Sequence, residues 1–205
     1  MFRKSLIRES YIAITNKVLR MSLPTMKQEI LETMLLYEKP MKAKEIADES
    51  KKEFRPVMMH LLGLVRMDYV CLPEKGHYII TEKGKQALGL PATDKEKATA
   101  ILCYSPHEKA FHFYLGMDKP LNLHAHNLRD FANKIQRVEL SSIQFHMKRG
   151  DFEAWLISLG DKELAKKVVL LNRKDMAGEE LRKQLYEIVE QRYIALAKMA
   201  GQPIQ

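Results

Sequence analysis

The chain has 205 residues, of which 46% are hydrophobic and 29% are charged, with nine Gly and eight Pro. This composition is typical of a folded protein and excludes the disordered, collagen-like and disulfide-scaffold classes. No run of 18 apolar residues occurs and no apolar leader opens the chain, so we expect no membrane span, no secretory signal and a cytoplasmic location. The two cysteines, Cys71 and Cys103, cannot build a cysteine-rich zinc site within one chain, and we expect both to be reduced thiols.

The charge balance is basic, with 34 Lys and Arg against 26 Asp and Glu, a net charge of +8 and a pI near 9.3. A basic balance suits a phosphate backbone or another anionic surface without requiring either. The excess is greatest near the N-terminus, where residues 1–20 contain a single acid, Glu9, against Arg3, Lys4, Arg8, Lys17 and Arg20.

Residues 1–22 contain an amphipathic stripe that predicts a helix. Its apolar positions alternate at four and three residues, and they are Ile7, Tyr11, Ile14, Val18 and Met21. Such a stripe needs a partner. Periodicity does not distinguish packing within the chain from a dimer contact, so the segment is expected either to brace the following domain or to dimerise.

Residues 23–90 have the pattern of three helices followed by a hairpin. The pattern predicts helices over 25–38, 43–50 and 54–67, a short extended piece at Pro40 and Met41, and strands over 69–73 and 77–81. Gly76 in the short connection between the two strands is typical of a hairpin. Thr81 is expected to cap a last helix over 82–88, which Gly89 ends.

The segments KAKEIADES, RPVMMHLLGLVRMDYV and KGHYIITEKGKQAL together resemble the winged helix-turn-helix domain of archaeal and bacterial transcription regulators. The resemblance implies a recognition helix near residues 52–66 that enters the major groove, and a wing at residues 73–77 that touches the backbone or the minor groove. It also implies a small core of Ile46, Ala47, Val57, Leu61 and Leu64. The sequence departs from the family at the turn, where Ser50-Lys51-Lys52 stands in place of the usual glycine.

We expect this domain to bind double-stranded DNA through seven residues, namely Lys51, Lys52, Arg55, Met59, His60, Arg66 and Lys75. The outward face of the third helix is expected to carry Met58, Met59 and Leu62, which offer no hydrogen bonds to base edges. Sequence specificity is therefore expected to be modest. The alternative is a protein-interaction adaptor that uses the same apolar side chains as a docking face.

Residues 91–99, PATDKEKAT, are polar and predict a linker, and residues 100–205 predict a helical domain. ILCY and KAFHFYLG have the content of short strands, and helical periodicity follows from Leu128 to the end. Ser141 and Ser142, Asp151 and Asp161 are expected to cap successive helices. The last helix, over 179–200, could pack along its own domain or form a dimer seam.

The second half resembles a family of domains of unknown function that is common in archaea, over about residues 109–197. The resemblance is carried by the segment from Ser142 to His146, the segment from Arg149 to Trp155, and Leu181-Arg182. It implies no activity. From the residues themselves, Phe145, Phe152 and Trp155 are expected in the core, and His146, Arg149 and Asp151 are expected to fix a corner between two helices. The alternative for that corner is an anion or small-ligand pocket.

Five histidines, His107, His112, His124, His126 and His146, fall within a short stretch of the second half. No carboxylate or cysteine stands at a recognised ligand spacing beside them, so we expect no metal site. The sequence also contains no nucleotide-binding, nucleophile-elbow or metalloprotease motif, and we expect no enzyme and no cofactor. A ligand-sensing or metal-dependent second domain remains an open alternative.

These observations predict a mainly α protein with a small β-hairpin, formed by an N-terminal winged helix-turn-helix domain and a C-terminal helical domain. The expected function is double-stranded DNA binding by a transcriptional regulator or DNA-associated protein. The expected assembly is a homodimer, whose two third helices would reach successive major grooves about 34 Å apart. A protein partner is a further possibility, and no membrane is involved.

Overall fold

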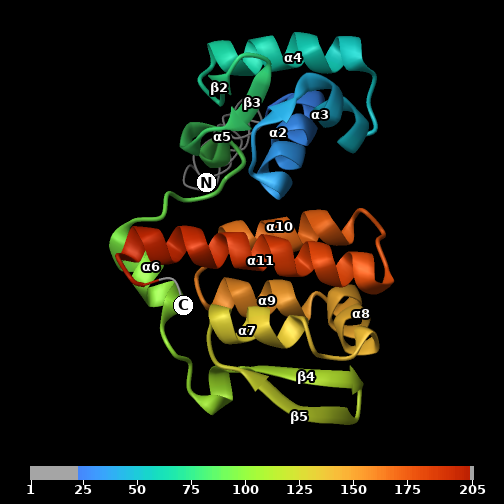
Figure 1. Cartoon of the computed structure of the whole chain (residues 1–205), viewed down its shortest axis with the longest axis vertical. Helices are drawn as coiled ribbons and strands as arrows, with labels where there is room; N and C mark the ends of the chain where they lie inside the picture. Colours follow the sequence, from blue (N-terminus) through green and yellow to red (C-terminus); the bar gives the residue numbers. More distant parts are fainter. Residues whose placement is uncertain (1–22, 204–205) are drawn as a thin grey trace, which may run out of the picture.

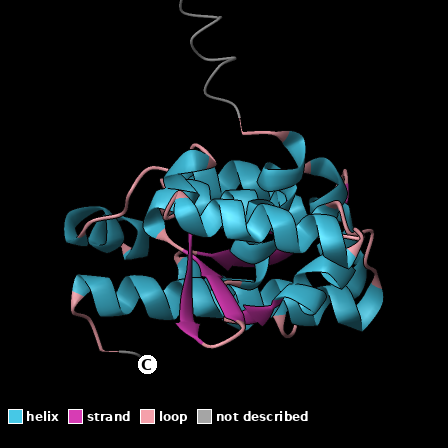
Figure 2. Ribbon diagram, turned by 90° about the horizontal axis from the view of Figure 1, so that it is seen from above, coloured by secondary structure: helices cyan, strands magenta, loops and turns pink. Residues whose placement is uncertain are grey.

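A computed structural model describes residues 23–203, so the helix predicted over residues 1–22 lies outside the described residues. The described chain is mainly helical and carries two small antiparallel sheets (Figure 2). The sequence predicted only one hairpin. The segment KAFHFYLG was expected to be a short strand, and it contains the first strand of a second hairpin, whose other strand was not predicted. Figure 1 shows the two halves stacked along the long axis of the molecule.

The N-terminal unit follows the predicted order of elements closely. It comprises α2 (Thr25–Tyr37), β1 (Met41–Lys42), α3 (Ala43–Glu49), α4 (Phe54–Arg66), β2 (Val70–Glu74), β3 (His77–Ile80) and α5 (Glu82–Ala87). The three strands form an antiparallel sheet in the order β1-β3-β2. Met41 pairs with Tyr78 and Val70 pairs with Ile80, so β3 lies in the middle of the sheet.

The core of this unit forms because each helix carries an apolar stripe. Ile46, Ala47, Val57, Leu61 and Leu64, the five core positions expected from the sequence, are all buried. They pack against the buried face of α2 and the inner side of the sheet. Thr81 caps α5 as predicted, because its hydroxyl accepts a hydrogen bond from the Gly84 amide at 3.1 Å.

The predicted linker is shorter than residues 91–99, because α6 (Lys95–Leu102) begins inside it. Asp94 caps this helix by accepting a hydrogen bond from the Lys97 amide at 2.8 Å. Ala98 and Ile101 are buried on its inner face. The charged composition that predicted a linker belongs instead to the exposed face of a helix, and ILCY, which was expected to be a strand, forms the end of that helix and the turn after it.

The C-terminal unit combines a hairpin with a set of helices. After the short helix η1 (His107–Lys109) come β4 (Phe111–Gly116), β5 (Lys119–Ala125), α7 (Leu128–Ile135), α8 (Leu140–Arg149), α9 (Asp151–Ser158), α10 (Lys162–Asn172) and α11 (Gly178–Ala200). In Figure 1, α10 and α11 lie next to the N-terminal unit, and the β4–β5 hairpin lies at the far end of the molecule. The last helix packs along its own unit, against α6, α7 and α10.

Two of the predicted caps in this half differ from the structure. Asp161 caps α10 as expected, because its carboxylate accepts a hydrogen bond from the Leu164 amide at 3.1 Å. Helix α8 begins at Leu140, before the serines expected to cap it, and Ser142 is buried inside it. Asp151 is the first residue of α9 and makes no cap, since its carboxylate binds side chains of α8.

The core of the C-terminal unit is aromatic. Phe111, Phe113, Phe131, Phe152 and Trp155 are buried and contact one another, with Phe131 and Phe152 rings 5.2 Å apart. Most of these pairs have the edge-to-face or tilted geometry that aromatic rings prefer. Phe152 and Trp155 are therefore core residues as predicted, whereas Phe145 is only half-buried.

The seam between the two units is ionic. Acidic side chains of α2 and α3 face basic side chains of α10 and of the turn that follows it. Lys166 pairs with Glu32 at 2.8 Å, and Lys174 pairs with Glu49 at 2.5 Å. Because each acidic side chain faces a basic one along the seam, these ion pairs favour one arrangement of the two units.

At the centre of the seam, six charged side chains form a network, namely Glu38, Lys85, Asp161, Glu163, Lys167 and Arg192. Lys167 is fully buried and binds Glu38, and Lys85 reaches Glu163 at 3.0 Å. Arg192 contacts both Asp161 and Glu163 at 2.9 Å. Burial raises the pKa of Glu38, but Lys167 and Lys85 outweigh burial and hold that pKa below its ordinary value.

Among the described residues, no helix is both long and apolar enough to cross a membrane. Cys71 and Cys103 are both exposed free thiols.

Candidate nucleic-acid interface

Helix α4 is amphipathic and presents one whole face to solvent. Val57, Leu61 and Leu64 are buried on its inner face. Arg55, Met59, Leu62 and Arg66 follow one another at spacings of four, three and four residues, and all four are exposed. Figure 1 shows α4 at the end of the molecule opposite the β4–β5 hairpin, so the C-terminal unit leaves this face open.

Five of the seven residues predicted to contact DNA are exposed, and they are Lys51, Arg55, Met59, Arg66 and Lys75. Lys52 and His60 are half-buried. The Lys52 ammonium lies 2.8 Å from a carboxylate oxygen of Glu29, so part of its charge is neutralised within the chain. The four exposed cations form no ion pair with any residue in the part of the chain that the structure describes.

The turn between α3 and α4 is tight although it has no glycine. Lys51 adopts a left-handed backbone conformation with φ of 54°, the region that a glycine would occupy most readily. The Lys52 amide then donates to the Ala47 carbonyl at 2.9 Å, which closes the turn. Lys51 therefore occupies the left-handed position that a glycine usually fills in this turn. Its side chain is exposed beside the start of α4.

The connection between β2 and β3 carries Lys75 at its tip, next to Gly76. Gly76 has φ of 80°, and a Cβ on it would meet no atom within 4 Å, so backbone conformation alone favours glycine here. The pairing of β2 with β3 shifts register between Cys71 and Glu74, and the hairpin is thus irregular near its tip. β2 packs against α4, which keeps the hairpin beside that helix.

Exposed apolar side chains accompany the cations. Met59 is 69% exposed, Phe54 50%, Leu62 45% and Leu72 44%. The sequence indicated Met59 and Leu62 but missed Phe54 at the start of α4 and Leu72 on β2. Met58, which was also expected to face outward, is half-buried because its sulfur packs against the Tyr78 hydroxyl at 3.8 Å.

The corner between α8 and α9 is held by His146, Asp151 and Arg149. His146 is buried; its Nε2 accepts a hydrogen bond from the Tyr114 amide at 2.9 Å, and its Nδ1 donates to Asp151 at 2.8 Å. Arg149 pairs with Asp151 at 3.1 Å and lies over the Phe145 ring. Burial lowers the pKa of His146, although Asp151 opposes it.

A hollow of about 300 Å³ opens beside this corner. Every polar group of His146 is already bonded within the chain, and Arg149 is already paired with a carboxylate. These contacts support the interpretation of the corner as structural rather than as an anion pocket.

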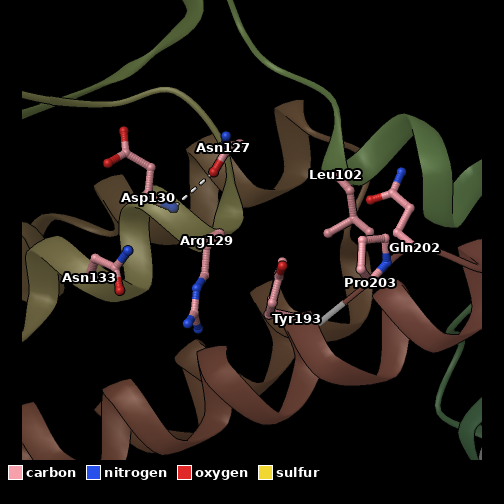
Figure 3. A pocket seen from close by; sticks show the side chains of 8 residues that line it. All are labelled: Leu102, Asn127, Arg129, Asp130, Asn133, Tyr193, Gln202 and Pro203. Carbon is pink, nitrogen blue, oxygen red and sulfur yellow. Dashed lines mark hydrogen bonds between the residues drawn. The ribbon is translucent and has the colours of Figure 1, made fainter. Parts of the chain in front are cut away.

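A larger hollow of about 400 Å³ lies between α7 and α11 (Figure 3). Its charged side chains are also engaged: Arg129 binds both oxygens of Glu190 at 2.7 and 2.8 Å, and Asp130 pairs with Lys134 at 2.6 Å. The dashed line in Figure 3 marks Asn127 capping α7 at the Asp130 amide. The charged side chains of this hollow are therefore occupied by contacts within the chain.

No curated protein and no solved structure matches the chain. The one match to a protein family lies in the second half of the chain. Residues 94–190 match the model of one family, which is described as a family of unknown function (DUF5752). The match covers α6 to most of α11, and it is consistent with the resemblance that the segment around Ser142, Arg149 and Trp155 carried.

Proposed function

We propose that this protein binds double-stranded DNA through helix α4 and the β2–β3 hairpin, as a transcriptional regulator or DNA-associated protein of modest sequence specificity. The observation that carries the proposal is the element order of residues 25–87. These residues form a helix, a short strand, two helices and a hairpin, and the first strand lies beside the second strand of the hairpin. This order supports the winged helix-turn-helix domain that the sequence resembles. In such domains the second helix of the helix-turn-helix lies in the major groove.

The charges support a phosphate-binding role for this surface. Lys51, Arg55, Arg66 and Lys75 are exposed on α4, on the turn before it and on the hairpin. A cation without an internal carboxylate partner is available to replace a counterion on a phosphate. If each of the four contacts one phosphate, the logarithm of the affinity should fall with the logarithm of salt concentration with a slope of about −3.6 per chain.

The side chains at the centre of α4 support modest specificity. Met59 and Leu62 can contact a thymine methyl group but cannot donate to or accept from a base edge. His60 is half-buried, so its ring is only partly available. Most of the affinity is therefore assigned to contacts with the DNA backbone. Sequence preference is assigned to the shape of the DNA and to a few apolar contacts with its bases.

The test is fluorescence anisotropy of a labelled random-sequence duplex at several salt concentrations. The variant with Lys51, Arg55, Arg66 and Lys75 changed to Ala should lose most of its binding and most of the salt slope. The matched control changes four exposed lysines of the C-terminal unit to Ala, namely Lys148, Lys162, Lys183 and Lys198. Both variants lose the same charge, so equal losses of binding would mean that net charge, rather than this surface, attracts DNA.

The exposed apolar group on α4 and β2 favours a second candidate, a protein-interaction adaptor. Changing Met59 and Leu62 to Ser distinguishes the two functions. If the protein binds DNA through this surface, the slope of the logarithm of the affinity against the logarithm of salt concentration should be unchanged in this variant. Neither Met59 nor Leu62 carries a charge that could pair with a phosphate. Retained assembly with a protein partner, if one is isolated, would argue against the adaptor.

The C-terminal unit is assigned a supporting role in this proposal, in effector binding, oligomerisation or partner binding. A homodimer would present two α4 helices to successive major grooves about 34 Å apart. Sedimentation of the full chain with and without duplex measures this directly. A strictly monomeric complex with a single half-site would remove the dimer from the proposal and leave the contact surface as it stands.

A further inference from the structure

Three histidines from separate segments of the C-terminal unit come together at one end of the β4–β5 hairpin. His107 lies in η1, His112 on β4 and His124 on β5. Their ring centroids are 4.8, 4.6 and 4.3 Å apart, and one nitrogen from each lies within 4.8 Å of the other two. His112 and His124 are directly opposite each other in the strand pairing, which brings their rings to the same face.

The hydrogen bonds around the cluster prepare its rings as ligands. His112 Nε2 donates to the His107 carbonyl at 2.9 Å, which leaves Nδ1 of the same ring with a free lone pair. Metal-binding histidines in proteins are commonly oriented by such a bond from the other ring nitrogen to a backbone carbonyl. Nδ1 of His124 is buried and has no hydrogen-bond partner within residues 23–203. A buried nitrogen without a partner is costly unless something else binds it.

The neighbouring His126 is not available as a metal ligand in the same way. His126 Nδ1 is bonded to the Ser105 carbonyl at 2.9 Å, and its ring stacks on Tyr104. The nearby ammonium of Lys134 is paired with Asp130 and also donates to the His124 carbonyl. The cluster therefore consists of three imidazoles, with solvent beyond the exposed His107.

We propose that His107, His112 and His124 form a binding site for Zn²⁺ or a similar divalent transition-metal ion, with water as the fourth ligand. Three imidazoles without a thiolate or carboxylate suit Zn²⁺ and its neighbours rather than Mg²⁺ or Ca²⁺, which prefer oxygen ligands. Ligand nitrogens in a tetrahedral zinc site are about 3.3 Å apart, given bond lengths of about 2.0 Å. The ligand nitrogens lie within 4.8 Å of one another, so they must close by at most about 1.5 Å, and rotation of the exposed His107 side chain can bring its nitrogen nearer to the other two.

Binding would join η1 to both strands of the hairpin and so tether the segment between α6 and β4. This site does not depend on the proposed DNA contact, because α4 lies at the other end of the molecule (Figure 1). The sequence favoured no metal site because neither the pairing of His112 with His124 nor the return of His107 towards them can be seen in the spacing.

The test is titration of tag-free, chelator-stripped full-length protein with Co²⁺, followed by visible absorption, and then displacement of Co²⁺ by Zn²⁺. We expect saturation at one ion per chain, and displacement by Zn²⁺. Excess Zn²⁺ at about 100 times its dissociation constant should raise Tm by roughly 5–10 °C. Mg²⁺ should give neither effect.

Variants identify the ligands. His107→Gln and His112→Gln should each weaken Co²⁺ binding by at least about tenfold, while the local control His126→Gln should bind as the parent chain does. His107 is exposed, so its replacement leaves the core intact, and circular dichroism checks the fold of each variant. The proposal is overturned if Co²⁺ fails to saturate at one equivalent, if His107→Gln retains full affinity, or if His126→Gln loses as much affinity as the other two.

Discussion

Lys167 provides the sharpest test of how the two units are held together. Its side chain is fully buried at the seam, where its ammonium binds Glu38 and lies 3.7 Å from Glu163. The change Lys167→Met keeps most of the stem and removes the charge. The three cations and three carboxylates of the network then become two against three, and a buried negative charge is left without compensation.

Breaking a buried ion pair by removing one partner typically costs about 3–5 kcal/mol, much more than losing a surface pair. We expect Lys167→Met to lower the free energy of unfolding by an amount in this range, measured by urea denaturation. The matched control is Lys162→Met on the same helix, which is exposed and should change stability by no more than about 0.5 kcal/mol. Adding Glu38→Gln to Lys167→Met should recover part of the loss, because it removes one uncompensated carboxylate.

The pH dependence gives a second measure of the same contact. The pKa of Glu38 is lowered in the folded protein, so its contribution to stability is present above its ordinary pKa of 4.5 and is lost as the pH falls through the folded value. Without Lys167 the folded pKa of Glu38 should rise, and acid destabilisation should begin at higher pH. A stability loss below about 0.5 kcal/mol together with an unchanged acid limb would refute the description of the seam.

Three further predictions concern the core and the turns. Phe131→Ala should cost about 3–5 kcal/mol in chemical denaturation because its ring is fully buried among other aromatic rings, whereas Phe54→Ala, half exposed on α4, should cost far less. Gly84→Ala should lower Tm, with a cost of about 1–3 kcal/mol, because the new Cβ would lie 2.2 Å from the Tyr69 carbonyl oxygen; Gly63→Ala, with only the end of a lysine side chain nearby, should be neutral or stabilising. His146 has a lowered pKa in the folded protein, so the unfolded chain takes up the proton first and the contribution of His146 to stability should fall as the pH drops below 6.5, which NMR titration of its ring can follow.

Each of these has an outcome that contradicts it. Equal effects of Phe131→Ala and Phe54→Ala would place the aromatic core elsewhere. An unchanged Tm for Gly84→Ala would mean that α5 does not approach Tyr69 so closely. A His146 titration midpoint at or above 6.5 would mean that the carboxylate of Asp151 outweighs burial.

The order of elements in the N-terminal unit could be predicted from the sequence because the signals there are local. Apolar spacing set the inner face of α4 at Val57, Leu61 and Leu64, and the Thr81 hydroxyl defined the start of α5. Met58 was the exception. One position on a helix face decides between core and solvent, and the packing of Tyr78 draws Met58 inward.

Strand β5 could not be predicted in the same way. It contains Pro120 and a left-handed Asn122 with φ of 49°, both of which are unusual inside a strand. Its pairing with β4 depends on register, which is a contact between segments and not a local pattern. Missing β5 also meant missing the histidine cluster, since His124 is brought to His112 only by that pairing.

The ionic seam was invisible for a related reason. Lys167 and Glu38 are far apart in sequence, and each resembles an ordinary surface charge on an amphipathic helix. Only the packing of α2 on α10 makes them neighbours. The prediction of a linker over residues 91–99 was wrong for a local reason. Asp94 and the apolar pair Ala98 and Ile101 mark the start and the buried face of a helix, but the charged composition around them concealed it.

The central claim, that α4 and the hairpin beside it form the DNA contact, is tested most directly by NMR. A titration of ¹⁵N-labelled protein with a short random-sequence duplex should shift the amide signals of Lys51, the exposed face of α4 and the turn at Lys75, while the signals of α10 and the aromatic core stay in place. Shifts confined to the C-terminal unit, or no shifts even at low salt, would contradict the claim and assign this face to another partner.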